Sequence, residues 1–366
     1  MLGREGMEGR WACAAITMSA ACVRWIGAPM IVALLVALGG GGPGRAADSV
    51  EAFYKGKTMQ LLIGFGPGGG YDLYGRALAR HLSRFIPGNP TIVPQNMAGA
   101  GSVRAASSLY NAAPKDGTVI GTFSRGIIVD TLLGANKGQF DAQNFGWIGS
   151  VTNEVSVCGF SRRSGIRTWD DMLTKDSTVG SSGTADDLGV YANVLRSVFN
   201  AKLKLVTGYP GTADILLAVE RGELGGLCGW SWSSLKSRSK ALYESKEIAV
   251  PVQLGLTPHE DLPDVPLITS LTKDPTKSAI LRLIFSRQTM ARPFAAPPGI
   301  PEERLRALRA AFDATMKDKD FLAEAQRLDL EVRPVSGREI DELVGNLAKT
   351  PSEIRKLAAE ASASPL

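Results

Sequence analysis

The stretch TMQLLIGFGPGGGYD, residues 58–72, predicts the fold of this chain. Its first eight residues form a short apolar run that ends in glycines, which is typical of a buried strand in a parallel sheet. A helix is predicted over 72–85, because Tyr74, Leu78 and Leu82 recur at a spacing of four and share one helical face. Strand, glycine-rich turn and helix in this order are the repeating unit of a parallel α/β sheet.

The alternation of strands and helices continues and then restarts. Further strands are predicted at 91–94 and 118–123, with a helix opening at 99–102 between them. In the second series, strands are predicted at 145–151, 155–158, 178–180, 204–207 and 248–254, and helices near 168–173, 188–199 and 212–221. Because 366 residues exceed one ordinary core, the two series predict two α/β domains, followed by a helical tail.

The first 46 residues predict an export signal rather than a part of the fold. Arg4, Arg10 and Arg24 precede the apolar run 26–38, and small residues follow it. The run has thirteen residues, fewer than the roughly 20 that a membrane-spanning helix needs. Cleavage after Ala46 would release a periplasmic protein. The alternative is an uncleaved membrane anchor, and a later methionine could be the true start.

Removal of the predicted signal would change the net charge of the chain and the number of its cysteines. Residues 1–46 hold four Arg and two Glu, so their removal lowers the net charge from +5 to about +3. An excess this small and dispersed gives no support for nucleic-acid binding. Cys158 and Cys228 are the two cysteines that remain. In an oxidising compartment they can form a disulfide, and two buried free thiols are the alternative.

The glycine-rich loop 64–72 is the most specific motif of the sequence. Its glycines let the backbone approach a ligand, and the helix that follows offers unpaired amides to an anion. Three of these glycines also fit the dinucleotide-binding pattern G-x-G-x-x-G. Two features oppose this alternative. Pro67 removes one amide, and the next strand ends in Pro-Gln-Asn at 94–96, where an acidic residue is expected.

Two further turns of small residues follow predicted strands, at 96–102 and 180–184. The carboxyl ends of parallel strands meet at one edge of a sheet, where α/β proteins bind their ligands. Three such turns, spread over two α/β units, therefore suit a ligand held between two domains. Taken singly, each turn is more often only a tight connection.

Residues that could carry catalysis or bind a metal are few. The two histidines, His81 and His259, have no partner at metal-ligand spacing, and no G-x-S-x-G motif occurs. Ser181 or Ser182 could serve as the nucleophile of a hydrolase, but no nearby base can be assigned. We therefore expect no enzyme, no cofactor and no metal site.

Two pairs of residues close in sequence have more than one interpretation. Asp186 and Asp187 are typical of a helix start rather than of a catalytic dyad. Trp230 and Trp232 are typical of packing residues, and the functional alternative is an aromatic wall of the ligand site.

Seven motifs, in order along the chain, resemble those of the extracytoplasmic solute receptors of tripartite tricarboxylate transporters, the TctC-like or Bug-type binding proteins. They lie at 65–72, 96–101, 113–118, 180–184, 209–211, 262–266 and 296–301, and span essentially the whole mature chain. The resemblance implies a type II periplasmic-binding-protein fold, with two α/β domains joined by a hinge and the ligand cleft between them. It also implies a first domain of 48–150 and 258–366 and a second domain of 151–257.

A function and a ligand site are implied by the same resemblance. Such receptors capture a small carboxylate, held by backbone amides and hydroxyls, and deliver it to membrane permease subunits. The turns described above offer amides and hydroxyls but no obvious arginine clamp. The resemblance implies a periplasmic protein without enzyme activity or cofactor, and we expect a monomer. Carried over by motif, the ligand-binding residues are Phe65, Gly66, Pro67, Gly68, Gly69, Tyr71, Asp72, Gly99, Ala100, Gly101, Ser181, Ser182, Gly183, Thr184 and Tyr209.

The sequence departs from the family pattern at three places. Gly66 or Gly68 replaces a second proline, Tyr71 stands where a small residue is common, and two aspartates follow the third turn. A tricarboxylate ligand is therefore not assumed. Two other functions remain as alternatives, an exported serine hydrolase and a solute-sensing receptor without a transporter.

Overall fold

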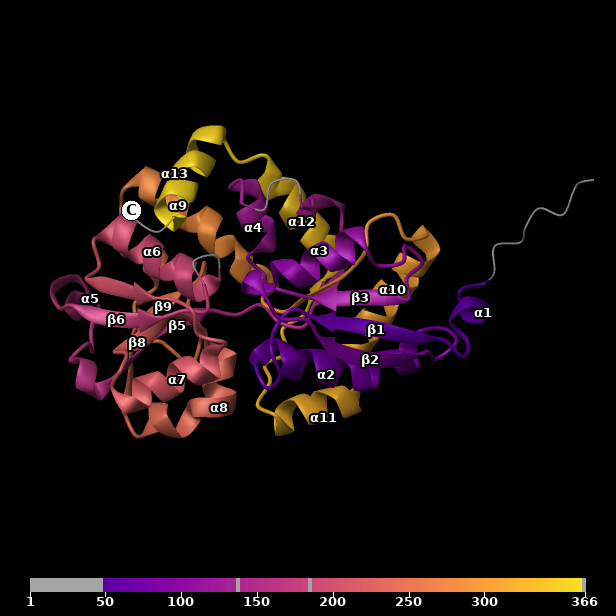
Figure 1. Ribbon diagram of the computed structural model, residues 1–366, viewed down its shortest axis with the longest axis horizontal. Helices are drawn as coiled ribbons and strands as arrows, with labels where there is room; N and C mark the ends of the chain where they lie inside the picture. The colour runs from indigo at the N-terminus through magenta and orange to yellow at the C-terminus, as the bar shows by residue number, and fades with distance from the viewer. Residues whose placement is uncertain (1–48, 136–138, 184–185, 364–366) are drawn as a thin grey trace, which may run out of the picture. The chain divides into compact units, whose positions relative to one another are not determined.

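A computed structural model describes residues 49–135, 139–183 and 186–363. Residues Met1–Ala47, which carry the predicted signal, lie outside the described residues, and Asp48–Leu366 form one compact unit. Within this unit the described strands form two separate sheets, with helices on their faces (Figure 1). The predicted α/β class is confirmed.

The first sheet has six strands in the order β11-β4-β10-β3-β1-β2. Their bounds are β1 Thr58–Ile63, β2 Thr91–Asn96, β3 Val119–Thr122, β4 Gly146–Ser150, β10 Pro293–Ala296 and β11 Val335–Ser336. β1 pairs in parallel with both β2 and β3, so the carboxyl ends of these three strands share one edge. β10 inserts between β3 and β4, antiparallel to both, although it comes from much later in the chain.

The second sheet has five strands in the order β7-β6-β8-β5-β9. Their bounds are β5 Ser156–Ser161, β6 Ser177–Gly180, β7 Leu203–Val206, β8 Gly226–Ser231 and β9 Ile248–Leu254. β6 is parallel to β7 and to β8, whereas β5 is antiparallel to β8 and β9. The predicted alternation of strands and helices therefore gives a parallel part in each sheet, completed by antiparallel strands.

Helices are present where they were predicted near 72–85, 168–173, 188–199 and 212–221, and the structure adds others that the periodicity did not predict. In the first half they are α1 Val50–Tyr54, α2 Gly70–Leu82, α3 Val103–Asn111 and α4 Ile127–Leu132; in the second, α5 Trp169–Thr174, α6 Asp187–Phe199, α7 Thr212–Arg221 and α8 Trp232–Glu244. The tail holds α9 Pro275–Phe285, α10 Glu302–Thr315, α11 Lys319–Arg327, α12 Gly337–Ala348 and α13 Ser352–Ser362. Tyr74, Leu78 and Leu82 are buried on one face of α2, which confirms the predicted helix and its face.

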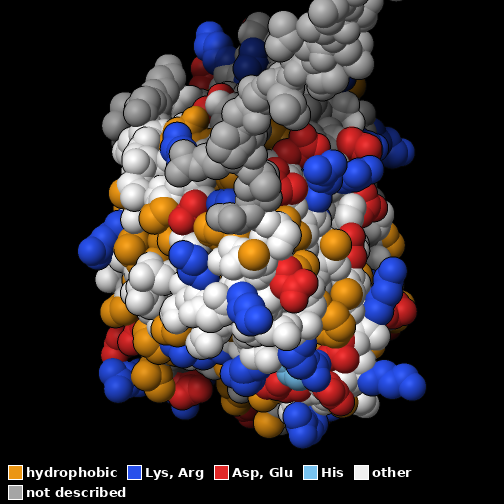
Figure 2. Space-filling model, turned by 90° about the vertical axis from the view of Figure 1, so that its right-hand side faces the viewer, with side chains coloured by type: hydrophobic (Ala, Val, Ile, Leu, Met, Phe, Trp, Pro, Cys, Tyr) orange, Lys and Arg blue, Asp and Glu red, His pale blue; other side chains and the backbone are white. Residues whose placement is uncertain are grey.

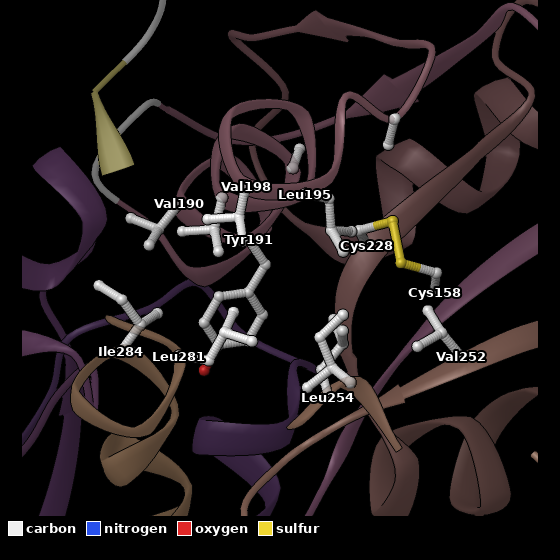
Figure 3. Close-up of a cluster of buried hydrophobic side chains, with 14 of the residues drawn as sticks. Cys158, Val190, Tyr191, Leu195, Val198, Cys228, Val252, Leu254, Leu281 and Ile284 are labelled. Atoms are coloured by element: carbon white, nitrogen blue, oxygen red, sulfur yellow. A yellow bond between two sulfur atoms is a disulfide. The ribbon is translucent and has the colours of Figure 1, made fainter. Parts of the chain in front are cut away.

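A core of buried side chains lies between the second sheet, α6 and two helices of the tail. Val190, Tyr191 and Leu195 of α6 pack there with Leu281 and Ile284 of α9 (Figure 3). Two tail helices, α9 and α13, therefore lie beside α6 of the second sheet (Figure 1). The same core includes residues of β5, β8 and β9.

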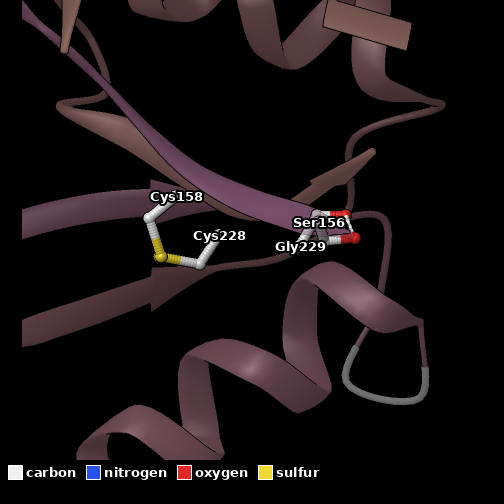
Figure 4. The surroundings of a disulfide bond; sticks show 4 residues. All are labelled: Ser156, Cys158, Cys228 and Gly229. Carbon is white, nitrogen blue, oxygen red and sulfur yellow. Dashed lines mark hydrogen bonds between the residues drawn. A yellow bond between two sulfur atoms is a disulfide. The ribbon is translucent and has the colours of Figure 1, made fainter. Parts of the chain in front are cut away.

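The structure joins Cys158 of β5 to Cys228 of β8 by a disulfide (Figure 3). The two residues face each other in the antiparallel ladder, with Cα atoms 3.9 Å apart, and both are fully buried. Further along the same strand pair, Oγ of Ser156 donates to the carbonyl of Gly229 (Figure 4). The bond therefore staples the middle of the second sheet and leaves the first sheet untouched.

The surface agrees with the dispersed charge of the sequence. On the face in Figure 2, basic and acidic side chains are interspersed wherever grey atoms do not cover the surface, and neither sign gathers into one large patch. In the described part of the chain, no helix is both long enough and apolar enough to cross a membrane.

Candidate functional site

The glycine-rich loop at the end of β1 is held in shape by Asp72. The Asp72 carboxylate accepts hydrogen bonds from the amide of Gly68 (2.8 Å), from Nε of Arg76 (2.9 Å) and from Nδ2 of Asn96 (2.8 Å). Burial alone would raise the pKa of Asp72, but these hydrogen bonds outweigh it and hold the pKa below its ordinary value. Asp72 thus connects the loop to the end of β2. Both oxygens of its carboxylate accept hydrogen bonds from within the chain.

Aromatic rings fill the other side of the same loop. The rings of Phe65 and Tyr71 are stacked, with centroids 4.4 Å apart, and the guanidinium of Arg292 lies 4.8 Å from the centroid of Tyr71. The hydroxyl of Tyr71 accepts a hydrogen bond from the amide of Arg125 at 3.0 Å. The bulkier residue at position 71 therefore links the first loop to the segment that follows β3.

The three loops that follow β1, β2 and β3 lie side by side. A Cβ atom on Gly64 would come within 2.6 Å of Cβ of Ser102, so the first and second loops approach each other closely. Oγ of Ser102 accepts from the amide of Ser124, which follows β3, at 2.7 Å. The predicted residues Gly99 and Ala100 are exposed at this edge, and Gly101 is half-buried beside them.

The corresponding loops of the second sheet also come together. The amide of Tyr209 donates to the carbonyl of Ser181 at 3.3 Å, which joins the loops after β6 and β7. Gly183 follows in the same loop, with its amide bonded to Oγ of Ser181. Thr184, the last predicted residue of this loop, lies outside the described residues.

The hydroxyl donors of this loop already have an acceptor in Asp186. Asp186 caps α6 and accepts from Oγ of Ser181 (2.8 Å), from the amide of Ser182 (2.9 Å) and from the amide of Gly189 (2.7 Å). Burial raises the pKa of Asp186, and these hydrogen bonds partly offset that effect. In this structure the donors that we predicted for a ligand carboxylate are bound to a carboxylate of the chain itself.

Three buried arginines stand where the loops of the two sheets meet, although the turns themselves contain no arginine. Arg125 follows β3, and its side chain reaches Oδ2 of Asp187 at 2.5 Å, Oγ of Ser156 at 2.7 Å and Oε1 of Glu154 at 3.3 Å. It thus connects the first sheet with the first residue of α6 and with the start of β5. Only 2% of Arg125 is exposed.

Arg287 and Arg292 come from the segment between α9 and β10. Arg287 donates to Oδ1 of Asp187 at 3.1 Å and to Oδ1 of Asp130 at 2.9 Å. Arg292 lies 2.8 Å from Oε1 of Glu154. Each buried arginine is therefore matched by a buried carboxylate, as an ion pair in a dry environment requires.

The pKa values in this network follow from burial and from the ion pairs. Burial raises the pKa of Asp130 to about 6, even though Arg287 acts in the opposite direction. Burial would also raise the pKa of Asp187, but Arg125 and Arg287 together hold it below its ordinary value. Asp187, paired with two arginines, therefore stays charged to lower pH than Asp130.

One of these arginines had a signal in the sequence. Arg125 comes just after a predicted strand of the parallel series, the same position that identified the glycine-rich loops. Arg287 and Arg292 had none, because nothing local shows that residues 286–292 return to the first sheet.

The remaining candidates from the sequence lie elsewhere. Trp230 and Trp232 are buried in the core of the second half, so they pack rather than form a wall of the site. His81 bonds to Glu324 and His259 to Glu331, and neither bonds to a serine of the third loop. Among the described residues, no group of three or more His, Cys, Asp or Glu could hold a metal ion.

The chain was compared with protein families, curated proteins and solved structures. No family model and no curated protein matches the sequence. The periplasmic binding protein BugD matches in structure with a TM-score of 0.66 at 17% identity, over 84% of this chain and 98% of BugD. MatC from Rhodopseudomonas palustris with bound malate matches with a TM-score of 0.64 at 16% identity, over 83% and 99% of the two chains. An R. palustris protein with adipate also matches with a TM-score of 0.64, at 17% identity, over 82% and 97%.

These matches span nearly the full length of each solved protein. They cover 82–84% of this chain, a share that includes residues of both sheets. At identities below one fifth, the similarity establishes the architecture. The chain has the two-sheet α/β architecture of the type II periplasmic binding proteins, as solved for the Bug- and TctC-type proteins.

Proposed function

We propose that this protein is the extracytoplasmic solute receptor of a tripartite tricarboxylate-type transporter, which captures a small carboxylate and delivers it to membrane permease subunits. The shared architecture with BugD, a periplasmic binding protein, supports the receptor class. Solved structures of similar fold hold malate and adipate, which are both dicarboxylates. A carboxylate-bearing solute is therefore the ligand class that we propose for this chain.

One observation carries the proposal, the meeting of loops from both sheets at buried arginine side chains. The loops after β1, β2 and β3 contact one another, and Arg125 extends from them to Asp187 at the start of α6. Binding proteins of this architecture hold a ligand at such a junction between two α/β units. Amides, hydroxyls and guanidinium groups are the donors that a carboxylate requires.

The residues proposed to contact the ligand are those at the loop ends. On the first-sheet side they are Phe65, Gly66, Pro67, Gly68, Gly69, Tyr71, Asp72, Gly99, Ala100 and Gly101, and on the second-sheet side Ser181, Ser182, Gly183, Thr184 and Tyr209. Because Asp72 and the two serines are bound within the chain, their part in binding would require these internal bonds to be exchanged for bonds to the ligand.

The proposal includes a location and a division into domains. Residues 1–46 are proposed to be removed on export, leaving a periplasmic monomer. The two domains are proposed to be 48–150 with 258–366, and 151–257, and to close by a hinge around the ligand. Small-angle scattering of the protein with and without saturating ligand tests the closure, and identical profiles would contradict it.

A serine hydrolase is the alternative from the class of enzymes, and it has less support than the solute receptor. A nucleophilic serine needs a base within hydrogen-bond reach. Ser181 bonds to Asp186, and both histidines of the chain bond to glutamates elsewhere. Hydrolysis of a simple ester that is abolished by Ser181→Ala or Ser182→Ala would favour the hydrolase. A sensory receptor has the same site, and two permease genes beside this gene would favour the transporter.

A thermal-shift screen of residues 47–366 tests the proposed function. The protein is refolded first, since such receptors can retain a ligand through purification, and is then mixed with mono-, di- and tricarboxylates, amino acids and aromatic acids. A ligand raises Tm in proportion to the logarithm of its concentration, whereas the neutral diamide of the same acid does not. If the folded protein responds to no carboxylate in the panel, the proposed ligand class is wrong.

A further inference from the structure

Asp187 forms the ion pairs that link the loops of the two sheets. Its Oδ2 accepts from Nε of Arg125 at 2.5 Å, and its Oδ1 accepts from Nη1 of Arg287 at 3.1 Å. Asp187 is the first residue of α6 and follows the third predicted ligand loop, whereas Arg125 follows β3 of the first sheet. The pair Arg125–Asp187 therefore lies between the two sets of predicted ligand loops.

We propose that Arg125 is the carboxylate-binding residue of this site, and that Asp187 is an internal carboxylate which the ligand carboxylate replaces on Arg125. The inference rests on the proposed function for the class of the ligand. It adds the residue that recognises the ligand and the group that competes with it.

The surroundings of Arg125 suit a fixed anion receptor. Its amide donates to the hydroxyl of Tyr71, while Nη2 donates to Oγ of Ser156 and Nη1 to Oε1 of Glu154. The two contacts of the guanidinium hold it in one orientation, with Nε directed to Asp187. A guanidinium so oriented binds a carboxylate with little further loss of side-chain freedom.

The exchange leaves no buried charge without a partner. When Asp187 leaves Arg125, its other oxygen keeps the ion pair with Arg287. Arg125 in turn keeps Glu154 and Ser156, and gains the ligand carboxylate. Because one carboxylate replaces another, the net charge at Arg125 is unchanged, and the large cost of an unpaired buried charge is avoided.

The two partners also differ in access to solvent. The Asp187 side chain is 14% exposed and the Arg125 side chain 2% exposed, so Asp187 lies on the solvent side of the pair. Asp187 can therefore turn away from Arg125, still paired with Arg287, while Arg125 stays in place. A neutral ester or amide cannot replace the charge of Asp187, so the exchange selects for ionised acids.

A chemical-rescue experiment tests the exchange with acetate as the probe, independently of the natural ligand. Residues 47–366 contain the whole compact unit, and Asp187→Ala in this chain leaves space for a small anion at Arg125. At pH 7.5, 100 mM sodium acetate should raise the Tm of this variant by about 3 °C relative to 100 mM sodium chloride. The double variant Arg125→Met/Asp187→Ala should show no such rise.

Two further variants complete the design. Asp187→Ser creates a similar space with a residue that suits the first turn of a helix, and is used if the alanine variant does not fold. Asp320→Ala is the matched control, because Asp320 also lies in a first helical turn and pairs with an arginine, Arg84, but on the surface. Acetate should not stabilise this control.

The outcomes are distinct from those of the ligand screen. Stabilisation by acetate of the Asp187 variant alone supports the exchange, even if no carboxylate in the screen binds the wild type. Equal responses of all variants, or none in two folded Asp187 variants, would overturn it and leave Arg125–Asp187 as a structural ion pair only. The proposed function would then still stand or fall by the screen.

Discussion

The disulfide of the second sheet should contribute a large share of the stability of the folded unit. Cys158 and Cys228 are 70 positions apart, and closing a loop of that length removes entropy from the unfolded chain worth about 4 kcal/mol. The double variant Cys158→Ala/Cys228→Ala should therefore lose about 4 kcal/mol of unfolding free energy, and its Tm should fall by about 6 °C.

The assay is urea denaturation of wild type and double variant, each with and without a thiol reductant in the denaturant. Both cysteines are fully buried in the core, so the reductant acts once the chain unfolds. It should lower the stability of the wild type to that of the double variant, and leave the variant unchanged. Val157→Ala, at a buried neighbour on β5, is the control for a cavity in the same strand, and its response to reductant should match that of the wild type.

Two results would refute this reasoning. The first is a loss below about 1 kcal/mol in the double variant, which would show that the loop-closure argument does not apply to this chain. The second is two free thiols in unreduced protein produced in the periplasm, measured by alkylation under denaturing conditions and intact mass. That result would favour the alternative of buried free thiols.

Three further predictions concern single residues. Burial raises the pKa of Asp130 to about 6, so the folded protein binds this proton more tightly than the unfolded chain. Asp130 should therefore contribute a fall of about 2 kcal/mol in unfolding free energy as pH rises from 4 to 7, and urea denaturation of Asp130→Asn should lack this contribution relative to the wild type. Gly64→Ala should lower the unfolding free energy by about 1–3 kcal/mol in urea denaturation, because its Cβ would meet Cβ of Ser102 at 2.6 Å. Gly66→Ala is the control: no atom beyond its chain neighbours lies within 4 Å of its Cβ, so its unfolding free energy should stay within about 0.5 kcal/mol of the wild type. Asp186→Ala should cost about 1–2 kcal/mol in the same assay, since it removes the cap of α6; a change below about 0.3 kcal/mol would contradict that role.

Much of the secondary structure could be predicted because its determinants are local. The apolar run and glycines of residues 58–72 predict β1 and the loop before α2, and the structure has both. The predicted strand 248–254 coincides with β9. By contrast, β10 was missed: four residues starting at a proline carry little periodicity, and the strand exists because it fits between β3 and β4.

The sequence predicted the loops of the candidate site but not the charged groups that their donors bind. Small residues after parallel strands indicate where loops converge, since strand direction alone brings carboxyl ends together. The same pattern does not show whether the donors of such a loop are free. Ser181 and Ser182 were predicted to bind a ligand, and the structure places the carboxylate of Asp186 on them.

By itself the sequence determined the α/β class, most strands and helices of the two α/β series and the positions of the small-residue loops after parallel strands, because these depend on residues a few positions apart. The tertiary structure alone decided the ion pairs of the site. Arg125 meets Asp187 across 62 positions, and Arg287 meets Asp130 across 157. No local pattern encodes such a partner. A buried charge takes the opposite charge that the path of the chain brings within reach, and that path is set by the packing of the two sheets.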